Sequence, residues 1–318
     1  MLQKIAIIGG SGNVGSHIAF LAAMGKMARE ILLFSIDLPR CKGVGLDISQ
    51  AAAVFNLPVF VKGCESYEEL SGSEVVIISA GFPRMPDMSR DDLLLKNAHI
   101  MKEIAQNIAR VAPQCLMIVV SNPLDVMCLV AEHWSGFPKK RVMGMAGILD
   151  GARLAYESKI RLNNPAHHIE SYVIGAHSDF MLPLLRHSLC DNKSLMEQFT
   201  PFVQEELIEQ TKNGGAKIVG YYQQGSAYFA PASAVIKMLE LIMNDTDEIV
   251  VCSVYAQGEY GIKDIYIGLP IRLNHKGVKE IITLPLNDQE RDMLHMSAQS
   301  IKKQVEILKN NELLNYRI

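Results

Sequence analysis

Two arginines lie on one loop-like segment of the chain. Arg84 and Arg90 are six residues apart in the stretch GFPRMPDMSRDD (81–92), which follows an apolar run, Val75–Ile78, typical of a buried strand. Arginine grips carboxylates through two parallel hydrogen bonds from its planar guanidinium group. The pair therefore favours a small anionic substrate, such as a diacid. Two solvated loop arginines would give the same local pattern, so this segment alone leaves both interpretations open.

A histidine and an acid–arginine pair could supply proton transfer. His177 lies in GAHSD (175–179), after a predicted strand at Glu170–Ile174, and its ordinary pKa of about 6.5 suits general acid–base catalysis. Asp150 and Arg153 share one face of a predicted helix start. A buried Asp150 beside His177 would fix the ring tautomer and stabilise its protonated form. The competing interpretations are a structural histidine and a surface ion pair of little energetic value.

Two further polar residues follow strand-like or glycine-led segments. Asn122 in SNPLD (121–125) follows the predicted strand Leu116–Val120, and ligands bind at the carboxyl ends of strands in open parallel sheets. Its amide would donate to a substrate oxygen, or else cap the helix expected from Leu124. Ser226 stands at a glycine-led helix entry, where we expect either substrate binding or helix capping.

A glycine-rich turn connects the first predicted strand to the first predicted helix. Residues 10–15 read GSGNVG, which fits G-x-G-x-x-G directly after strand Lys4–Ile8. The glycines allow a tight turn, a close approach of the main chain to a pyrophosphate, and close packing of the helix on the strand. Because the motif lies in a strand–turn–helix context, it predicts dinucleotide binding. The expected cofactor-binding residues of this turn are Gly10, Ser11, Gly12, Asn13, Val14 and Gly15.

The end of the second predicted strand bears on which dinucleotide is used. An acid about 20 residues past the glycines usually binds the ribose hydroxyls of NAD. Here the strand Ile31–Phe34 is followed by Ser35, and the acid, Asp37, comes two positions later, before Arg40. If Asp37 reaches the ribose, NAD is preferred; if Ser35 and Arg40 meet it, a 2'-phosphate fits and NADP is accepted. We favour NAD, although Asp37 would also suit an ordinary turn.

Alternating strands and helices would hold these groups together. In the first half, strands are predicted at 4–8, 31–34, 58–61, 75–79, 115–120 and 141–143, and helices at 13–24, 45–54, 91–111 and 124–133. This order indicates parallel βαβ units with right-handed crossovers, and hence a doubly wound Rossmann sheet in residues 1–143. In residues 144–318 we expect an α+β substrate-binding domain. Its predicted helices are 150–161, 194–222, 232–243 and 288–309, and its strands 170–174, 248–254, 265–273 and 278–282.

The composition narrows the class of protein. The chain has 318 residues, 49% hydrophobic and 20% charged, with a formal net charge of -3, which gives no reason to expect nucleic-acid or membrane partners. No apolar run reaches the roughly 18 residues that a membrane span needs. Six scattered cysteines have no zinc-type spacing, so we expect no metal. Cys115 and Cys128 are expected as core thiols. Together with the absence of a signal peptide, this predicts a reducing, cytoplasmic location.

Six segments, in order, resemble the lactate/malate dehydrogenase family over nearly the whole chain. They are GSGNVG, AGFPRMPDMSRDDLL, SNPLD, GILDGAR, GAHSDFMLPL and GSAYFAPA. The arginine segment is similar to that of the lactate-dehydrogenase-like malate dehydrogenases, which carry Arg where Arg84 stands, whereas lactate dehydrogenases typically carry Gln. The resemblance implies an NAD-dependent oxidoreductase that interconverts malate and oxaloacetate.

The resemblance also assigns catalytic and substrate-binding roles. It implies that His177 donates and accepts the proton and that Asp150 orients it. Arg153 would bind the C1 carboxylate with two hydrogen bonds, Arg84 the second carboxylate, and Arg90 would polarise the reacting carbonyl.

The remaining implied roles concern the cofactor side and the loop. Asn122 would bind the substrate near the nicotinamide, and Asn97 and Val120 match positions that contact the cofactor. The segment 82–92 would close over the substrate as a lid, excluding water and delivering Arg90.

Four positions depart from the family pattern. Ser35 replaces the usual Asp, which bears on cofactor preference, and Ser178 replaces a Gly beside the catalytic ring. Met85 and Asp87 replace the Lys and Gly of the usual Arg-Lys-Pro-Gly segment. These last two changes make the lid less positive and less flexible, which would weaken dianion binding.

Two other functions compete with this interpretation. A lactate or other 2-hydroxyacid dehydrogenase is disfavoured by Arg84, and a non-catalytic dinucleotide-binding protein by the intact set of implied catalytic residues. The family forms dimers or tetramers, so a homodimer or homotetramer is expected. The helices at 13–24 and 45–54 would suit an interface, although helices packed inside one chain give the same pattern.

Overall fold

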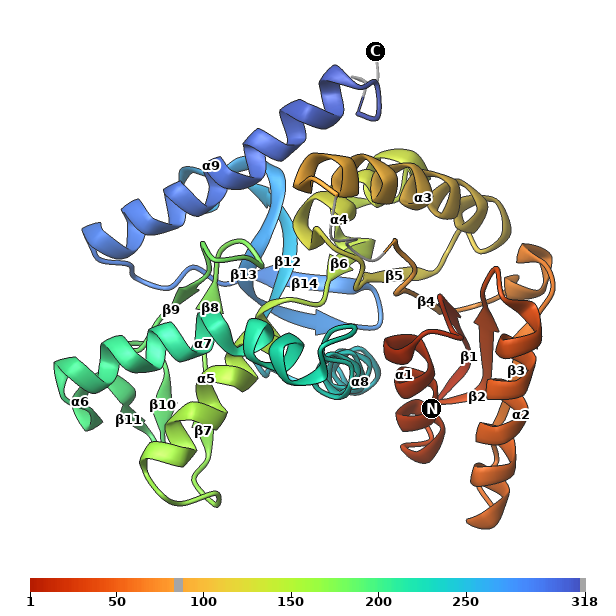
Figure 1. The fold of residues 1–318 in the computed structure, drawn as a ribbon, viewed down its shortest axis with the longest axis horizontal. Helices are drawn as coiled ribbons and strands as arrows, with labels where there is room; N and C mark the ends of the chain where they lie inside the picture. Colours follow the sequence, from red (N-terminus) through yellow and green to blue (C-terminus); the bar gives the residue numbers. More distant parts are fainter. Residues whose placement is uncertain (83–87, 315–318) are drawn as a thin grey trace.

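The computed structural model describes residues 1–82 and 88–314. Six strands of the first half lie parallel, in the spatial order β6-β5-β4-β1-β2-β3 (Figure 1). Their bounds are β1 (Leu2–Ile8), β2 (Ala28–Phe34), β3 (Phe60–Cys64), β4 (Val75–Ile78), β5 (Leu116–Val119) and β6 (Val142–Gly144). The strand order reverses between β1 and β4, and such a switch point creates a ligand crevice at the carboxyl ends of the strands.

Helices cover both faces of this sheet. The first-half helices are α1 (Asn13–Met24), α2 (Leu38–Val54), α3 (Arg90–Val111) and α4 (Leu124–Ser135), with short 3-10 turns η1 (Tyr67–Leu70) and η2 (Lys139–Arg141). Helices α1 and α2 pack on one face together with α8 (Phe229–Asn244), and α3 and α4 pack on the other with α9 (Asp288–Asn310). The predicted doubly wound α/β fold is therefore confirmed.

The large sheet continues beyond residue 143. Three strands, β12 (Val250–Gln257), β13 (Lys263–Asn274) and β14 (Gly277–Ile281), form an antiparallel extension, and β12 pairs with β6 at Ser253 and Gly144. A short 3-10 turn, η3 (Glu259–Gly261), connects β12 to β13. The strand-rich stretch expected in the second half thus extends the sheet of the first half.

The remaining elements build a smaller lobe beside this sheet. It contains α5 (Gly147–Arg161), α6 (Leu195–Gln198) and α7 (Pro201–Tyr222). Five two-residue strands complete it, namely β7 (Ile169–Glu170), β8 (Val173–Ile174), β9 (Leu182–Pro183), β10 (Leu189–Cys190) and β11 (Lys193–Ser194). A small separate apolar cluster lies inside this lobe, whereas one continuous core runs through the main sheet.

Several predicted bounds are corrected by the structure. The strand expected at Glu170–Ile174 is two short strands, and the helix expected over 194–222 is broken before Pro201, which cannot donate a main-chain hydrogen bond. Helix α2 begins at Leu38 instead of Gly45, because Asp37 caps it. Cys115 and Cys128 are buried, as predicted, and all six cysteines are free. In the described ranges, none of the helices has the length and apolarity required to traverse a lipid bilayer.

Candidate active site

The glycine turn after β1 has the form of a phosphate cradle. Gly12 is the N-cap of α1, so the first turn of this helix points its main-chain N–H groups at the strand ends. A Cβ atom on Gly15 would lie 2.3 Å from the Gly9 carbonyl oxygen, so a larger residue would push the helix away from the turn. Gly9 itself has a φ of 85°, which side chains other than glycine rarely adopt. The residues present therefore fit a dinucleotide pyrophosphate.

Beside the cradle, hydroxyl groups stand at the end of β2. Ser11 Oγ donates to Ser35 Oγ at 2.7 Å, which ties the glycine turn to the residue after β2. The Asp37 carboxylate accepts from the Arg40 N–H at 3.1 Å and thereby caps α2. The Asp37 side chain thus has a local structural role, and Ser35 is the residue directly at the strand end.

Two asparagines connect neighbouring strand ends. Asn97 on α3 is buried; its Oδ1 accepts from the Phe82 N–H at 2.6 Å, and its Nδ2 donates to the Asn122 carbonyl oxygen at 2.7 Å. Asn122 is exposed and does not cap α4, whose N-cap is Pro123, so the capping interpretation was wrong. Val120 is buried at the end of β5. Asn97 therefore aligns the segments that follow β4 and β5.

The predicted histidine, aspartate and arginine form one connected group. His177 Nδ1 lies 2.7 Å from Asp150 Oδ2, and Arg153 Nη1 donates to Asp150 Oδ1 at 2.9 Å. The Asp150 side chain is 3% exposed and that of Arg153 16%, so this is no surface ion pair. An ionised carboxylate only accepts hydrogen bonds, so His177 carries a proton on Nδ1 and presents Nε2 to a ligand.

The charges around His177 favour its protonated form. Burial alone lowers the pKa of His177, but the charge of Asp150 and the hydrogen bond to it outweigh burial, so the pKa is raised. Arg153 opposes this effect and Asp125 reinforces it. A ring in this environment can donate a proton to a carbonyl oxygen and recover it from a hydroxyl.

Two glycines of α7, not anticipated as site residues from the sequence, make room for Arg153. A Cβ atom on Gly214 would lie 2.9 Å from Arg153 Cδ, and one on Gly215 would lie 3.1 Å from Arg153 Nη2. Glycine inside a helix costs roughly 0.5–1 kcal/mol. The sequence signal was present, a Gly-Gly pair inside a long helical pattern, but only the packing of α7 on α5 gives it meaning.

A second aspartate, also not anticipated, contacts the histidine. Asp125 is 5% exposed in the first turn of α4; its Oδ2 accepts from the His177 N–H at 2.9 Å and its Oδ1 from Ser253 Oγ at 2.6 Å. Burial raises the pKa of Asp125 to about 6, although these hydrogen bonds oppose the effect. The SNPLD motif contains Asp125, but nothing local in the sequence points to Ser253, which lies 128 residues away.

For the other predicted site residues that the structure describes, it gives no contact with the group formed by His177, Asp150 and Arg153. Arg90 is the exposed first residue of α3, after its N-cap Ser89. Arg84 lies outside the described residues, as do the other residues of 83–87 within the segment 82–92 predicted to be a lid. Ser226 is exposed, and it is not the N-cap of α8, a position held by Tyr228.

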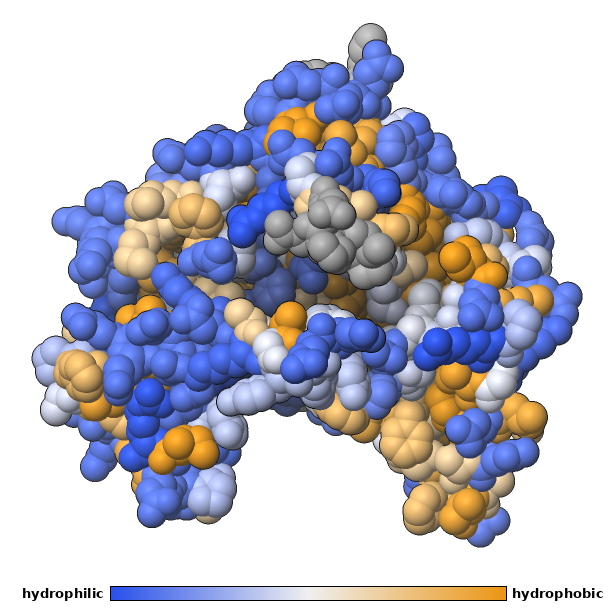
Figure 2. Space-filling model, in the orientation of Figure 1, coloured by the Kyte–Doolittle hydropathy of each residue, from blue (hydrophilic) through white to orange (hydrophobic). Residues whose placement is uncertain are grey.

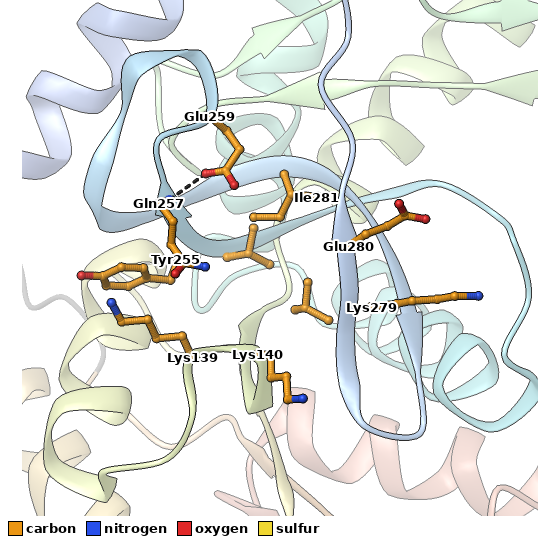
Figure 3. Close-up of a pocket in the computed structure, with 10 residues that line it drawn as sticks. Lys139, Lys140, Tyr255, Gln257, Glu259, Lys279, Glu280 and Ile281 are labelled. Carbon is orange, nitrogen blue, oxygen red and sulfur yellow. Dashed lines mark hydrogen bonds between the residues drawn. The ribbon is translucent and has the colours of Figure 1, made fainter.

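Two other features lie outside this group. Within the described ranges, His167, Cys190 and Asp191 lie close enough to share a metal ion, but His167 Nδ1 already pairs with the Asp191 carboxylate at 2.5 Å and burial raises the pKa of the Cys190 thiol. A cavity of about 220 Å³ lies between η2, β12 and β14 (Figure 3). There Lys139 lies over the Tyr255 ring, with its Nζ 3.5 Å from the ring centroid. Neither feature includes His177.

The fold and this site define a dinucleotide-binding protein whose histidine–aspartate pair is arranged so that it can transfer a proton. Comparison with known proteins identifies the family within this class. Residues 3–144 match the lactate/malate dehydrogenase NAD binding domain, and residues 148–312 match the alpha/beta C-terminal domain of the same family. The chain belongs to the lactate/malate dehydrogenase family, which confirms the resemblance seen in the sequence and the expectation of NAD.

Individual relatives agree with this assignment. The chain is 69% identical to a malate dehydrogenase of Helicobacter hepaticus over 314 residues, which span 99% of this chain and 100% of the relative. Among solved structures, a Cryptosporidium parvum malate dehydrogenase superposes with a TM-score of 0.92 at 34% identity, covering 98% of this chain and 100% of that one. An Eimeria maxima lactate dehydrogenase with NADH and oxamate also gives 0.92, at 32% identity, covering 100% and 98%. The fold alone therefore does not separate the two activities.

Proposed function

We propose that the protein is a malate dehydrogenase that interconverts (S)-malate and oxaloacetate with NAD. One observation carries the chemistry, namely the buried contact between His177 and Asp150, with Arg153 on the second oxygen of the same carboxylate. The preference for malate follows from Arg84 in the sequence and from the similarity to the Helicobacter hepaticus malate dehydrogenase.

Proton transfer falls to His177. When bound, the nicotinamide cofactor would supply the redox chemistry, taking up the hydride from C2 of malate or returning it to oxaloacetate. During oxidation, Nε2 of His177 takes the hydroxyl proton; during reduction, the protonated ring donates it to the carbonyl oxygen. Asp150 holds the ring in the required tautomer and stabilises its positive charge throughout, without itself exchanging the proton. The glycine turn and Ser35 would hold the cofactor.

Three arginines would orient the substrate. Arg153 has one nitrogen on Asp150 and the remainder of its guanidinium group available for the C1 carboxylate. Arg84 would bind the second carboxylate, and Arg90 would stabilise negative charge on the reacting oxygen. Fixing the substrate at both ends favours a reactive geometry.

The test compares two substrates in one assay. Initial rates of NADH oxidation are measured with oxaloacetate and with pyruvate at equal concentration, and then again with NADPH. A large preference for oxaloacetate supports the proposal, and a preference for pyruvate makes the protein a lactate-type 2-hydroxyacid dehydrogenase. Binding of NADH without turnover of any 2-oxoacid would instead revive a non-catalytic dinucleotide-binding role.

A homo-oligomer is also part of the proposal. Large apolar side chains are exposed on and beside α1 and α2, among them Phe20, Leu46, Val54, Phe55 and Phe60. Figure 2 shows apolar surface over the lower end of α2. Exposed apolar surface of this kind marks contact sites between proteins, which supports a dimer or tetramer formed through these helices. Light scattering combined with size-exclusion chromatography would distinguish monomer, dimer and tetramer.

The proposal also assigns a role to each half of the chain and a location to the protein in the cell. Residues 1–143 would bind the cofactor and residues 144–318 would supply His177, Asp150 and Arg153. A cytoplasmic location is supported by the six free cysteines, because reducing compartments keep thiols unpaired.

A further inference from the structure

The main chain around His177 is anchored by three different elements. Gly175 exchanges two hydrogen bonds with Gly268 of β13, at 2.9 and 3.0 Å. The Ala176 N–H donates to Ser297 Oγ of α9 at 2.7 Å, and the His177 N–H donates to Asp125 Oδ2 of α4 at 2.9 Å. Successive residues of this loop are thus fixed from different sides, and the anchor on the histidine itself is a carboxylate.

A buried, ionised carboxylate at position 125 lowers the stability of the folded protein. Asp125 is buried, and the hydrogen-bond donors that reach it within the described part of the chain are a main-chain N–H and the Ser253 hydroxyl, both uncharged. Charged groups are rarely buried unless a charged partner compensates them. The start of α4, with its positive dipole end, compensates part of the charge. A residue needed only for packing would not have to hold a hydrogen-bond acceptor against the main chain of His177.

Asp125 also connects two parts of the site. It follows Asn122 by three residues, and its partner Ser253 lies on β12, next to Gly144 at the junction of the two halves of the sheet. The segment that places Asn122 at the end of β5 therefore also holds the main chain of His177. Meanwhile Asp150 holds the side chain of His177 from α5.

We propose that Asp125 is a positioning residue, whose carboxylate holds the main chain of His177 so that the imidazole meets Asp150 and the substrate together. The proposal rests on the proposed function, because it concerns the residue that transfers the proton there. Its physical reason is geometric, since a displacement of about 1 Å in a catalytic group can cost roughly 100-fold in rate.

Two substitutions at Asp125 separate hydrogen bonding from charge. In Asp125→Asn, the amide oxygen can still accept from the His177 N–H while the amide nitrogen donates to Ser253 Oγ, so we expect kcat within about threefold of wild type. Asp125→Ala removes both contacts, and kcat for oxaloacetate reduction should fall by roughly 10- to 100-fold while KM for NADH changes less than about threefold.

Two serine variants complete the series. Ser253→Ala removes one donor from Asp125 and should give a smaller loss of kcat; it is the second variant that tests the same contact if Asp125→Ala does not fold. Ser49→Ala is the matched control, because Ser49 Oγ also bridges a helix to a strand, donating to the Val61 carbonyl at 2.8 Å and accepting from its N–H at 2.9 Å. It lies in α2, away from His177, and should leave kcat unchanged.

The pH dependence of kcat/KM is a further measurement, and it should change only if the Asp125 carboxylate acts on His177. The charged and titratable groups that face Asp125 and His177 are Asp150 and Arg153 from α5 and Cys128 from α4. The negative charge of Asp125 favours protonated His177. In Asp125→Asn, kcat/KM for oxaloacetate should therefore start to fall at a lower pH than in the wild-type protein. NMR titration of the His177 ring should show the same change without requiring turnover.

The outcomes separate this proposal from the proposed function. An inactive wild-type protein overturns the proposed function, and the NMR signal of the hydrogen-bonded His177 Nδ1 proton in Asp125→Ala then decides the role of Asp125: its loss supports the positioning role, and an unchanged signal overturns it. An active wild type with Asp125→Ala and Ser253→Ala at full kcat overturns the positioning role. Loss of kcat in Asp125→Asn equal to that in Asp125→Ala also overturns it, because the hydrogen bonds would then not be what matters.

Discussion

Replacing Asp125 with asparagine should stabilise the protein at neutral and alkaline pH. Burial raises the pKa of this carboxyl from 3.8 to about 6. The folded state therefore binds the proton of the Asp125 carboxyl more tightly than the unfolded chain does. As a result, the free energy of unfolding falls as the pH rises from 3.8 to about 6, and it stays at the lower value at higher pH. A difference of about 2 pH units corresponds to roughly 3 kcal/mol of unfolding free energy. Asparagine keeps the hydrogen bonds and removes this cost.

The assay is denaturant unfolding of both proteins at one protein concentration, at about pH 5 and about pH 8. At about pH 5, about half of the loss in unfolding free energy caused by ionised Asp125 is already present. The difference in unfolding free energy between Asp125→Asn and the wild-type protein should therefore grow by roughly 1.5 kcal/mol from about pH 5 to about pH 8. Asp47→Asn, a change of an exposed aspartate of α2, is the control and should show no such growth. An advantage for Asp125→Asn that is the same at both pH values would refute the reasoning, because no charge would then be held at a cost.

Four other changes test the site. His177→Asn should lower kcat by roughly 100-fold or more, measured by NADH absorbance, and near-normal turnover would remove His177 from the mechanism. Arg84→Gln should damage oxaloacetate reduction far more than pyruvate reduction; equal damage means that it does not select the substrate. Ser35→Asp should raise the NADH-to-NADPH ratio of kcat/KM by about tenfold or more, because a carboxylate there repels the 2'-phosphate, and an unchanged ratio contradicts this placement. Gly214→Ala should raise KM for oxaloacetate by about tenfold by displacing Arg153, and an unchanged KM would show that the guanidinium group adapts.

Elements with strong local signals were predictable from the sequence. Helix α1 spans Asn13–Met24 as expected, because a glycine turn defines its start and its apolar positions are regular. The start of α2 was missed by seven residues, although Asp37 and Pro39 are an N-cap and a first-turn proline and gave the signal. The strand expected at 58–61 lies at Phe60–Cys64, where Lys62 and Gly63 interrupt the apolar pattern of an edge strand.

Long-range pairing was not predictable in the same way. The β-rich stretch of the second half was recognised, but its junction with β6 depends on the approach of Ser253 to Gly144, for which the sequence has no local signal. The two-residue strands β9 to β11 are likewise set by tertiary packing. The pairing of His177 with Asp150 was anticipated because both carry chemistry, whereas Asp125 was passed over as part of the motif around Asn122.

The burial of every cysteine makes the chain resistant to thiol chemistry. All six thiols are buried, and burial raises the pKa of each. Because only the thiolate attacks an alkylating reagent, labelling must wait for the fold to open. The rate at which each thiol is alkylated therefore reports how often the structure around it opens. Cys41 reports on the start of α2 and Cys190 on the small lobe. Cys128 and Cys252 report on the packing around Asp125 and Ser253.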